Sequence, residues 1–404
     1  MQAKAGIDRN GLLLLALVAV FAFTFLNFKG TADADNWLRW VAQTRENGLV
    51  GGYRSADMNY PPLAFALLTV SARAGTVIGI SERTGIKLAI YAMLLLTMSV
   101  FLLYSKNVML TVMLGLSLML NSVDLAYIDI FFAPFLLAAL WALEKQKLAL
   151  FAVAYVLAVL TKWQPLVLAP FFVLYLLKID SLKEIRAIPW QRILAQVALP
   201  VVGMLGVTFA IFGMPLLKSL QQALSFPVLS AQALNANWIL TYVLNIVDPI
   251  RYAPLVNGAP NFIFESQGLI SSLPRILFWL IFAAILVLWF RAPKTFENLM
   301  LFSLLGYLAY FTFGIGAHEN HLFVAVLLAA VLAHLSKEYI HVFVTWALVA
   351  NINLFIFYGI DGRTLPFSRL VWGFDTSIAL AAVNVILFVA YFAIVIRKTR
   401  DVRE

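Results

Sequence analysis

Two carboxylates follow directly on the first apolar run of the chain. Asp33 and Asp35 are two residues apart, so they do not share a helix face, and we expect only one to point into a cavity. A partly desolvated carboxylate near a cation can act as a general base on a hydroxyl group. Aspartate is also a favoured helix N-cap. The pair therefore offers either a catalytic base or a cap.

A single cation interrupts a long apolar stretch in the first half of the chain. Lys162 lies inside the stretch from Leu148 to Leu177, and Pro165 is expected to bend the chain beside it. A lysine at such a position needs an anionic partner or a path to water, and a bound phosphate would provide the partner. The alternative is a side chain that reaches the outer headgroups.

Two histidines and an acid share one short segment late in the chain. His318 and His321 flank Glu319 and Asn320, a spacing that differs from the His-Glu-x-x-His pattern of zinc proteases. Hydrogen bonding to a phosphate or a sugar is therefore favoured over metal binding, and a plain polar turn is a further alternative. The chain has no cysteine, which excludes disulfides, thiolate metal sites and cysteine nucleophiles.

The elements that must position these residues are membrane helices. The chain has 404 residues, of which 63% are hydrophobic and 12% are charged. Soluble domains carry about 25% charged residues, so this composition argues against a soluble enzyme and against a disordered chain. The formal net charge is +9, but no basic run forms a nucleic-acid patch. We expect membrane lipids, and no nucleic acid, among its partners.

Apolar runs predict a single all-α integral membrane domain, 1–404, with about twelve transmembrane helices. The runs are Gly11–Phe28, Leu88–Tyr104, Val108–Leu120, Leu125–Leu143, Leu148–Leu160, Leu166–Leu177, Ile193–Phe212, Ile276–Phe290, Leu299–Phe313, Leu322–Leu335, Ile340–Tyr358 and Ile378–Ile396. The run Leu63–Ile80 carries Arg73 at its centre, and we interpret it as a re-entrant or interfacial segment.

The distribution of lysine and arginine assigns the two sides of the membrane. If Leu63–Ile80 does not cross, the loops on one side carry clusters such as Lys145–Lys147 and Arg397–Arg403, whereas the short connections around Asn121 and His318 carry none. The positive-inside rule then predicts that both termini are cytoplasmic and that the candidate residues are extracytoplasmic.

Two long excursions fall on the predicted outer side, 29–87 and 213–275. Both are far longer than ordinary connections, and both are rich in aromatic residues, including Trp37 in the first and Tyr242 in the second. Aromatic side chains of this kind suit helices that lie at the headgroup level, so we expect interfacial helices in each excursion.

Short motifs along the chain carry a family resemblance. They are Asp33–Trp40 (DADNWLRW), Tyr60–Leu63 (YPPL), Lys162–Pro165 (KWQP) and His318–His321 (HENH), with Asn235–Trp238 (NANW) as a further segment. In their order along the chain and their common location on the predicted outer side of the membrane, these motifs resemble those of the C superfamily of glycosyltransferases. The members of that superfamily are multi-span enzymes that use polyprenyl-phosphate sugars, and they include lipid-linked mannosyl- and glucosyltransferases. The late loop departs from many relatives, which have a basic residue at the position of Asn320.

The resemblance implies an inverting glycosyltransferase. A hexose, with mannose favoured, would move from a polyprenyl-phosphate donor to a glycolipid or glycan acceptor, with no metal and no cofactor. Asp33 would be the general base, with Asp35 as the secondary candidate. Lys162, His318 and His321 would bind the donor phosphate. The substrate-binding candidates are Trp40, Tyr60, Gln164, Asn237, Trp238 and Glu319.

Two other functions fit a polytopic chain. A secondary transporter would place its substrate groups near the membrane midplane and commonly shows repeated halves, whereas this sequence has no internal repeat and its candidate groups lie at one rim. A lipid-carrier oligosaccharide ligase or polymerase would use a diphosphate-linked donor. For the transferase, the bacterial or archaeal plasma membrane is the expected location.

Overall fold

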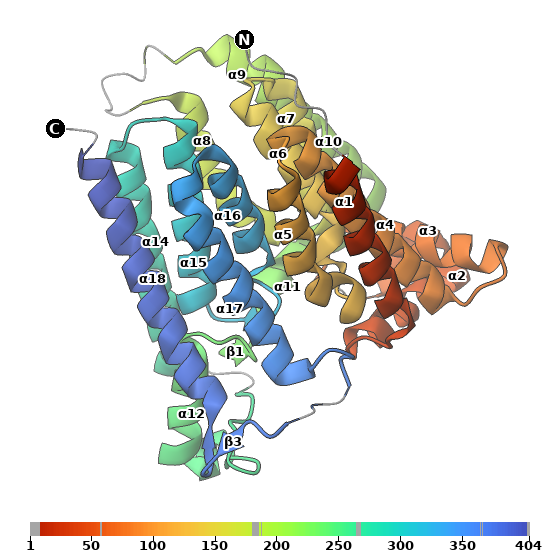
Figure 1. Ribbon diagram of the computed structural model, residues 1–404, viewed down its shortest axis with the longest axis vertical. Helices are drawn as coiled ribbons and strands as arrows, with labels where there is room; N and C mark the ends of the chain where they lie inside the picture. The colour runs from red at the N-terminus through yellow and green to blue at the C-terminus, as the bar shows by residue number, and fades with distance from the viewer. Residues whose placement is uncertain are drawn as a thin grey trace.

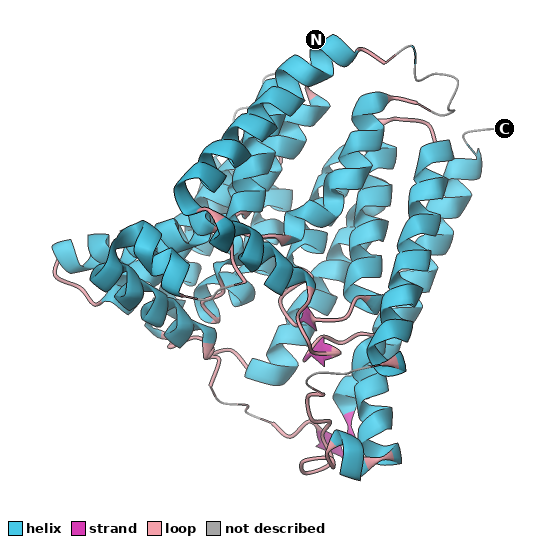
Figure 2. Ribbon diagram, turned by 180° about the vertical axis from the view of Figure 1, so that it is seen from behind, coloured by secondary structure: helices cyan, strands magenta, loops and turns pink. Residues whose placement is uncertain are grey.

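The computed structural model describes residues 9–56, 59–179, 186, 188–263, 268–363, 365 and 367–401. Most of its helices run up and down in one bundle, and α2 and α3 lie across that direction at one edge (Figure 1). Seen from behind, the strands are small insertions in a helical molecule (Figure 2). The expected all-α class is confirmed.

The first half of the chain contributes ten helices to the described structure. They are α1 (Arg9–Thr24), α2 (Asp33–Ser55), α3 (Pro62–Val77), α4 (Glu82–Ser105), α5 (Val108–Met119), α6 (Ala133–Glu144), α7 (Leu148–Thr161), α8 (Ala169–Leu177), α9 (Trp190–Ile193) and α10 (Leu199–Phe212). A 3-10 turn, η4 (Gln164–Leu168), joins α7 to α8.

The second half adds further helices and two small strand pairs. The helices are α11 (Met214–Leu224), α12 (Ala236–Val247), α13 (Pro249–Tyr252), α14 (Leu269–Arg291), α15 (Phe296–Phe313), α16 (Phe323–Leu335), α17 (Ile340–Tyr358) and α18 (Thr376–Asp401). Strand β1 (Ser230–Ala231) pairs in parallel with β2 (Ala317–His318), and β3 (Leu370–Val371) pairs antiparallel with β4 (Phe374–Asp375).

Seven helical segments of the described chain are long and apolar enough to cross a membrane. They are Arg9–Asn27, Glu82–Ser105, Trp190–Phe212, Leu269–Arg291, Phe296–Phe313, Lys337–Tyr358 and Thr376–Thr399. These segments indicate a membrane protein. Other predicted spans are shorter apolar helices, such as Val108–Asp124 and Phe323–Leu335. The count of about twelve spans therefore stays a prediction.

The predicted span Leu125–Leu143 is not one continuous helix. After α5 the chain forms a π-helical turn, Leu120–Asp124, then a loop and a 3-10 turn, Ile128–Phe131, before α6 begins. Ala126 adopts a left-handed φ of 61° in this loop. The break brings the buried side chain of Asp129 to the end of α6, beside the candidate residues.

Both long excursions contain helices, as the sequence predicts. The first holds α2 and α3, and the second holds α11, α12 and α13. Their position at a membrane surface stays a prediction. The centre of the bundle is formed by α15 and α16, whose side chains are almost all buried. This rigid centre carries the loop 314–322, which contains the two histidines.

Candidate functional site

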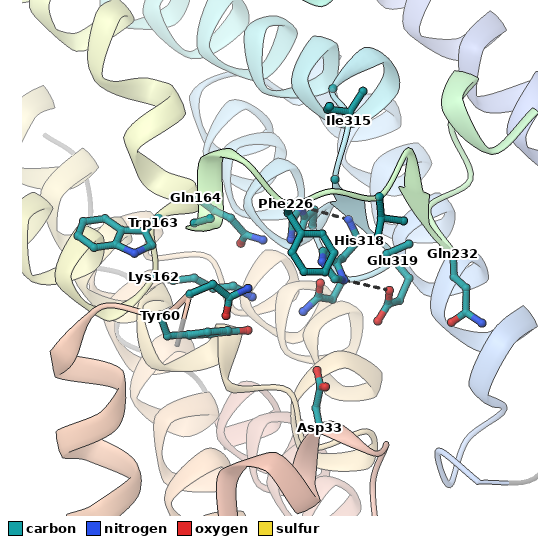
Figure 3. A pocket seen from close by; sticks show the side chains of 18 of the residues that line it. Asp33, Tyr60, Lys162, Trp163, Gln164, Phe226, Gln232, Ile315, His318 and Glu319 are labelled. Carbon is teal, nitrogen blue, oxygen red and sulfur yellow. Dashed lines mark hydrogen bonds and ion pairs between the residues drawn. The ribbon is translucent and has the colours of Figure 1, made fainter. Parts of the chain in front are cut away.

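A cavity of about 700 Å³ lies where widely separated parts of the chain meet. Its walls come from the start of α2, the segment between α2 and α3, the α7–η4 junction, the segment after α11 and the loop between α15 and α16. Figure 3 shows Asp33, Tyr60, Lys162, His318 and Glu319 around one space. Four sequence motifs thus supply side chains to one cavity.

The first turn of α2 is held against the broken segment after α5. The Thr31 N–H donates to the Leu125 carbonyl at 3.0 Å, and the Trp37 indole N–H donates to the Ala126 carbonyl at 3.0 Å. Gly30 has a φ of +75°, and a Cβ there would lie 2.7 Å from the Cβ of Ala126. Glycine at this position therefore allows the close approach that fixes the start of α2.

Asp33 begins α2 and directs its carboxylate toward the cavity (Figure 3). It accepts a hydrogen bond from the Asn36 amide at 3.3 Å. The pKa of Asp33 is raised from 3.8 to about 6, mainly by burial and then by the nearby Glu319, while His318 and Lys162 oppose the shift. The carboxylate is therefore mostly ionised at neutral pH but close to its titration range, as a general base requires.

Asp35 lies outside the cavity lining. Its two carboxylate oxygens accept hydrogen bonds from Arg83 at 2.5 Å and from Arg363 at 2.9 Å. The hydrogen bonds from Arg363 and then Arg83 lower the pKa of Asp35 below 3.8. Arg83 and Arg363 also donate to the carbonyls of Lys29 and Gly30, at 3.0 and 2.9 Å. Asp35 thus ties the first loop to α4 and to the loop after α17.

Neither aspartate caps α2. The cap position is Ala32, which makes no side-chain capping hydrogen bond. The alternative interpretation of these residues as helix caps therefore has no support in the observed contacts, and only one of the pair reaches the cavity, as the spacing predicts.

Lys162 finds its anionic partner inside the protein. Its ammonium lies 2.5 Å from Oδ1 of Asp129, whose side chain is fully buried, and the Asn320 amide donates to Oδ2 of Asp129 at 2.8 Å. The ammonium also lies 5.3 Å from the centre of the Tyr60 ring. Asp129 is not among the residues predicted from the sequence, although an acid inside an apolar run indicates a buried partner.

His318 and His321 are brought together by the β2 strand and the turn after it. The His318 N–H donates to Nδ1 of His321 at 3.3 Å, and that Nδ1 lies 2.9 Å from the Tyr310 hydroxyl. Because Nδ1 accepts, the neutral ring of His321 carries its proton on Nε2. Burial lowers the pKa of His318 to about 4 and the pKa of His321 well below 6.5. Both rings are therefore neutral at pH 7 and act as hydrogen-bonding groups.

Glu319 forms a second acidic group in the cavity wall. It accepts hydrogen bonds from the Tyr127 hydroxyl and, at 3.1 Å, from the Tyr358 hydroxyl. Its other oxygen lies 3.9 Å from Nδ1 of His318. Burial raises the pKa of Glu319, and the hydrogen bond from Tyr127 partly opposes that shift. Glu319 is thus an anchored side chain beside Asp33.

An aromatic wall faces these polar groups. The rings of Trp37 and Trp40 lie 4.9 Å apart, and Tyr60 lies 5.4 Å from Trp40, in edge-on contact. Pro61 and Pro62 fix the chain between Tyr60 and α3, where Pro62 is the first helical residue. Gln164 also lines the cavity and is buried, at 7% exposure.

Asn237 and Trp238 lie outside the cavity lining. The Asn237 amide donates to the carbonyls of Phe313 and Gly314, at 3.1 and 2.9 Å. The Trp238 indole donates to Ser377 at 2.9 Å. These contacts attach α12 to α15 and α18, so in this structure both residues support the fold around the site rather than face its interior.

No metal-binding cluster occurs in the described part of the chain, where no three or more histidine and acidic side chains converge in a suitable group. In comparisons with known proteins, no family model matches the chain and no curated protein matches its sequence. The functional interpretation therefore depends on the cavity and on the motif resemblance.

Proposed function

We propose that the protein is an inverting glycosyltransferase that moves a hexose from a polyprenyl-phosphate donor to a glycolipid or glycan acceptor, with mannose as the favoured sugar. The observation that carries this proposal is the convergence of Asp33, Lys162 and the His318–His321 segment on one cavity. These residues come from separate motifs of the resemblance, and Asp33 has the environment of a base.

The reaction is a single displacement at the anomeric carbon. Asp33 accepts the proton of the acceptor hydroxyl as that oxygen attacks, the bond from the anomeric carbon to the phosphate oxygen breaks, and the lipid phosphate leaves with the bonding electrons. The configuration inverts, and the proton on Asp33 passes to solvent. General-base assistance contributes typically 10²–10⁴-fold to such a step.

The cavity offers two kinds of wall for this reaction. Its volume of about 700 Å³ falls in the usual range for small-molecule sites, about 300–1,000 Å³. Trp40 and Tyr60 present aromatic surface to a sugar, and the neutral His318 and His321 provide N–H groups that can hydrogen bond to oxygen atoms of the donor. The Lys162–Asp129 pair keeps a fixed positive charge at the cavity wall, balanced by a buried carboxylate.

The proposed location is the bacterial or archaeal plasma membrane, with the cavity extracytoplasmic and both termini cytoplasmic. The directions of the helices are consistent with termini and cavity on opposite sides of the membrane. In Figure 1, α1 runs down from its first residue and α18 runs up to its last, whereas β1 lies in the lower part of the molecule. The ends of the described chain therefore point one way and the site lies toward the other.

Purified protein, a radiolabelled polyprenyl-phosphate mannose and a panel of acceptors provide the test. We expect lipid phosphate to be released only when an acceptor is present, and the release to be lost in Asp33→Asn. Asp35→Asn is the matched control, because this side chain lies outside the cavity lining, and it should retain the wild-type rate. Release without acceptor, or equal rates for both variants, would contradict the proposal.

The same assay separates the alternative functions. A secondary transporter would move its substrate across a liposome membrane without releasing lipid phosphate. A ligase or polymerase would require a diphosphate-linked oligosaccharide and would not use the monosaccharide donor.

A further inference from the structure

Two basic side chains line the cavity, Lys162 and Arg275. Lys162 is paired with the buried Asp129 at 2.5 Å. Within the described residues, the guanidinium of Arg275 has no ion pair and no hydrogen bond. Arg275 is therefore the basic group of the cavity whose charge is available to a ligand.

The acids of the cavity act electrostatically with Lys162, and Arg275 is not among the charged groups that shift their pKa values. Asp33 and Glu319 line the cavity and are within electrostatic range of Lys162, and Asp129 is paired with its ammonium. A phosphate placed against Lys162 would also lie close to these carboxylates. Their negative charges would repel it, and this repulsion would offset the attraction of the Lys162 ammonium. The charge distribution thus favours an anion near Arg275 and a neutral sugar near Asp33.

Arg275 lies at an exposed edge of the cavity. It is exposed in the second turn of α14, about 9 Å along the axis from the first residue of that helix. Trp279 is one turn further on, and Leu224 at the end of α11 lines the same cavity. Trp279 is 61% exposed and Leu224 is 73% exposed. An apolar surface therefore leads from the outside of the bundle into the cavity past one arginine.

We propose that Arg275 binds the phosphate of an isoprenoid phosphate lipid at this mouth, with the isoprenoid chain lying against Trp279 and Leu224 and the sugar pointing inward to Asp33. The inference rests on the proposed function and specifies which basic residue holds the donor. The Lys162–Asp129 pair is then a fixed part of the cavity wall, not the primary phosphate contact.

Binding of the lipid alone tests the inference without requiring turnover. Native mass spectrometry of the full chain in detergent would compare a short isoprenoid phosphate, the matching isoprenoid alcohol, phosphatidylglycerol and inorganic phosphate. We expect the isoprenoid phosphate to bind best in the wild type. Arg275→Gln should weaken its binding at least about tenfold, the scale of one charge-assisted hydrogen bond, and leave the alcohol unchanged. Arg275→Lys should restore part of the loss.

Arg73→Gln is the matched control. Arg73 is also an exposed arginine on an apolar helix, but it does not line the cavity. Wild-type binding of isoprenoid phosphate is expected in this variant. Equal weakening by Arg73→Gln, or equal binding of phosphatidylglycerol and isoprenoid phosphate to the wild type, would show that Arg275 contacts headgroups in general and would overturn the inference.

The outcomes distinguish a failure of this inference from a failure of the proposed function. If the wild type prefers isoprenoid phosphate and Arg275→Gln binds it equally well, the assignment of Arg275 is wrong while the transferase proposal stands. If the wild type does not distinguish the phosphate from the alcohol, the phosphate-donor chemistry itself is contradicted. In transfer assays, Arg275→Gln should raise the donor KM with a smaller change in kcat, because the phosphate is bound before and during the reaction.

Discussion

The substitution Asp33→Asn tests the catalytic assignment through two measurements. We expect the transfer rate to fall and the stability at alkaline pH to rise. Asparagine has the same shape as aspartate but cannot accept the acceptor proton. The transfer rate should therefore fall by the contribution of a general base, about 10²–10⁴-fold. In the wild type, the rate should fall about tenfold per pH unit well below the Asp33 pKa of about 6, because only the ionised carboxylate acts.

The same substitution should make the protein more stable at alkaline pH. Asp33 has a folded-state pKa of about 6 against 3.8 for the free side chain, so the folded protein retains a proton that the unfolded chain loses in this window. Stability of the wild type thus falls as pH rises from 3.8 toward 6, and the loss persists above it. The shift corresponds to at most about 3 kcal/mol, reduced by solvent screening because the side chain is partly exposed.

Thermal unfolding in detergent at pH 4 and pH 8, together with a pH–rate profile, provides the assay. We expect Asp33→Asn to melt above the wild type at pH 8, with a smaller difference at pH 4. A variant with near-native rate would refute the role as base. A variant that is both slow and less stable at pH 8 would indicate a structural role for the carboxylate and would equally refute the reasoning.

Further variants at Asp129, Glu319 and Asp35 extend the test to the neighbouring groups. Asp129→Ala leaves the Lys162 ammonium buried without its partner and should lower the unfolding free energy by about 3–5 kcal/mol in thermal unfolding, whereas Asp129→Leu combined with Lys162→Met should recover most of that loss. Glu319→Gln removes an electrostatic contribution that raises the pKa of Asp33, so the acid limb of the pH–rate profile should move to lower pH; an unmoved limb would show that the two carboxylates are not coupled. Asp35→Asn breaks two exposed ion pairs and should lower the unfolding free energy by under about 1 kcal/mol per pair, measured by thermal unfolding, with the transfer rate retained.

Much of the architecture follows from composition and apolar run length. Segments such as Ile193–Phe212 and Ile378–Ile396 are long and almost free of charge, and each corresponds to a helix long enough to span a membrane. The apolar run Leu125–Leu143 was wrongly predicted to be one continuous helix. The mean hydropathy of the run stays high despite Asp129, and it contains no information about a break in the helix. The shape of the chain there depends on a left-handed residue, Ala126, which has no clear sequence signal.

The candidate site was predictable in part. The four motifs lie on one predicted side of the membrane, and the resemblance to glycosyltransferases requires their side chains to line one site. Tyr60, Lys162 and Glu319 do line the cavity with Asp33. Asn237 and Trp238 do not line it, because a motif match identifies a segment without showing which helix face is turned inward. Asp129 and Arg275 were missed for a different reason, since each is a single charged residue outside any motif, and only the structure shows which residues lie around it.

The Lys162–Asp129 pair has a consequence for how the chain enters the membrane during synthesis. The two residues are 33 positions apart, at the ends of the neighbouring helices α6 and α7, whereas Asn320 follows Asp129 by 191 positions. An unpaired charge next to an inserting apolar helix is unfavourable in the membrane. Pairing within the α6–α7 hairpin would let both segments integrate as an electrically neutral unit long before the ribosome has made the late loop. Substitution of either residue should therefore disturb biogenesis and yield of the protein, even where the finished site tolerates the change.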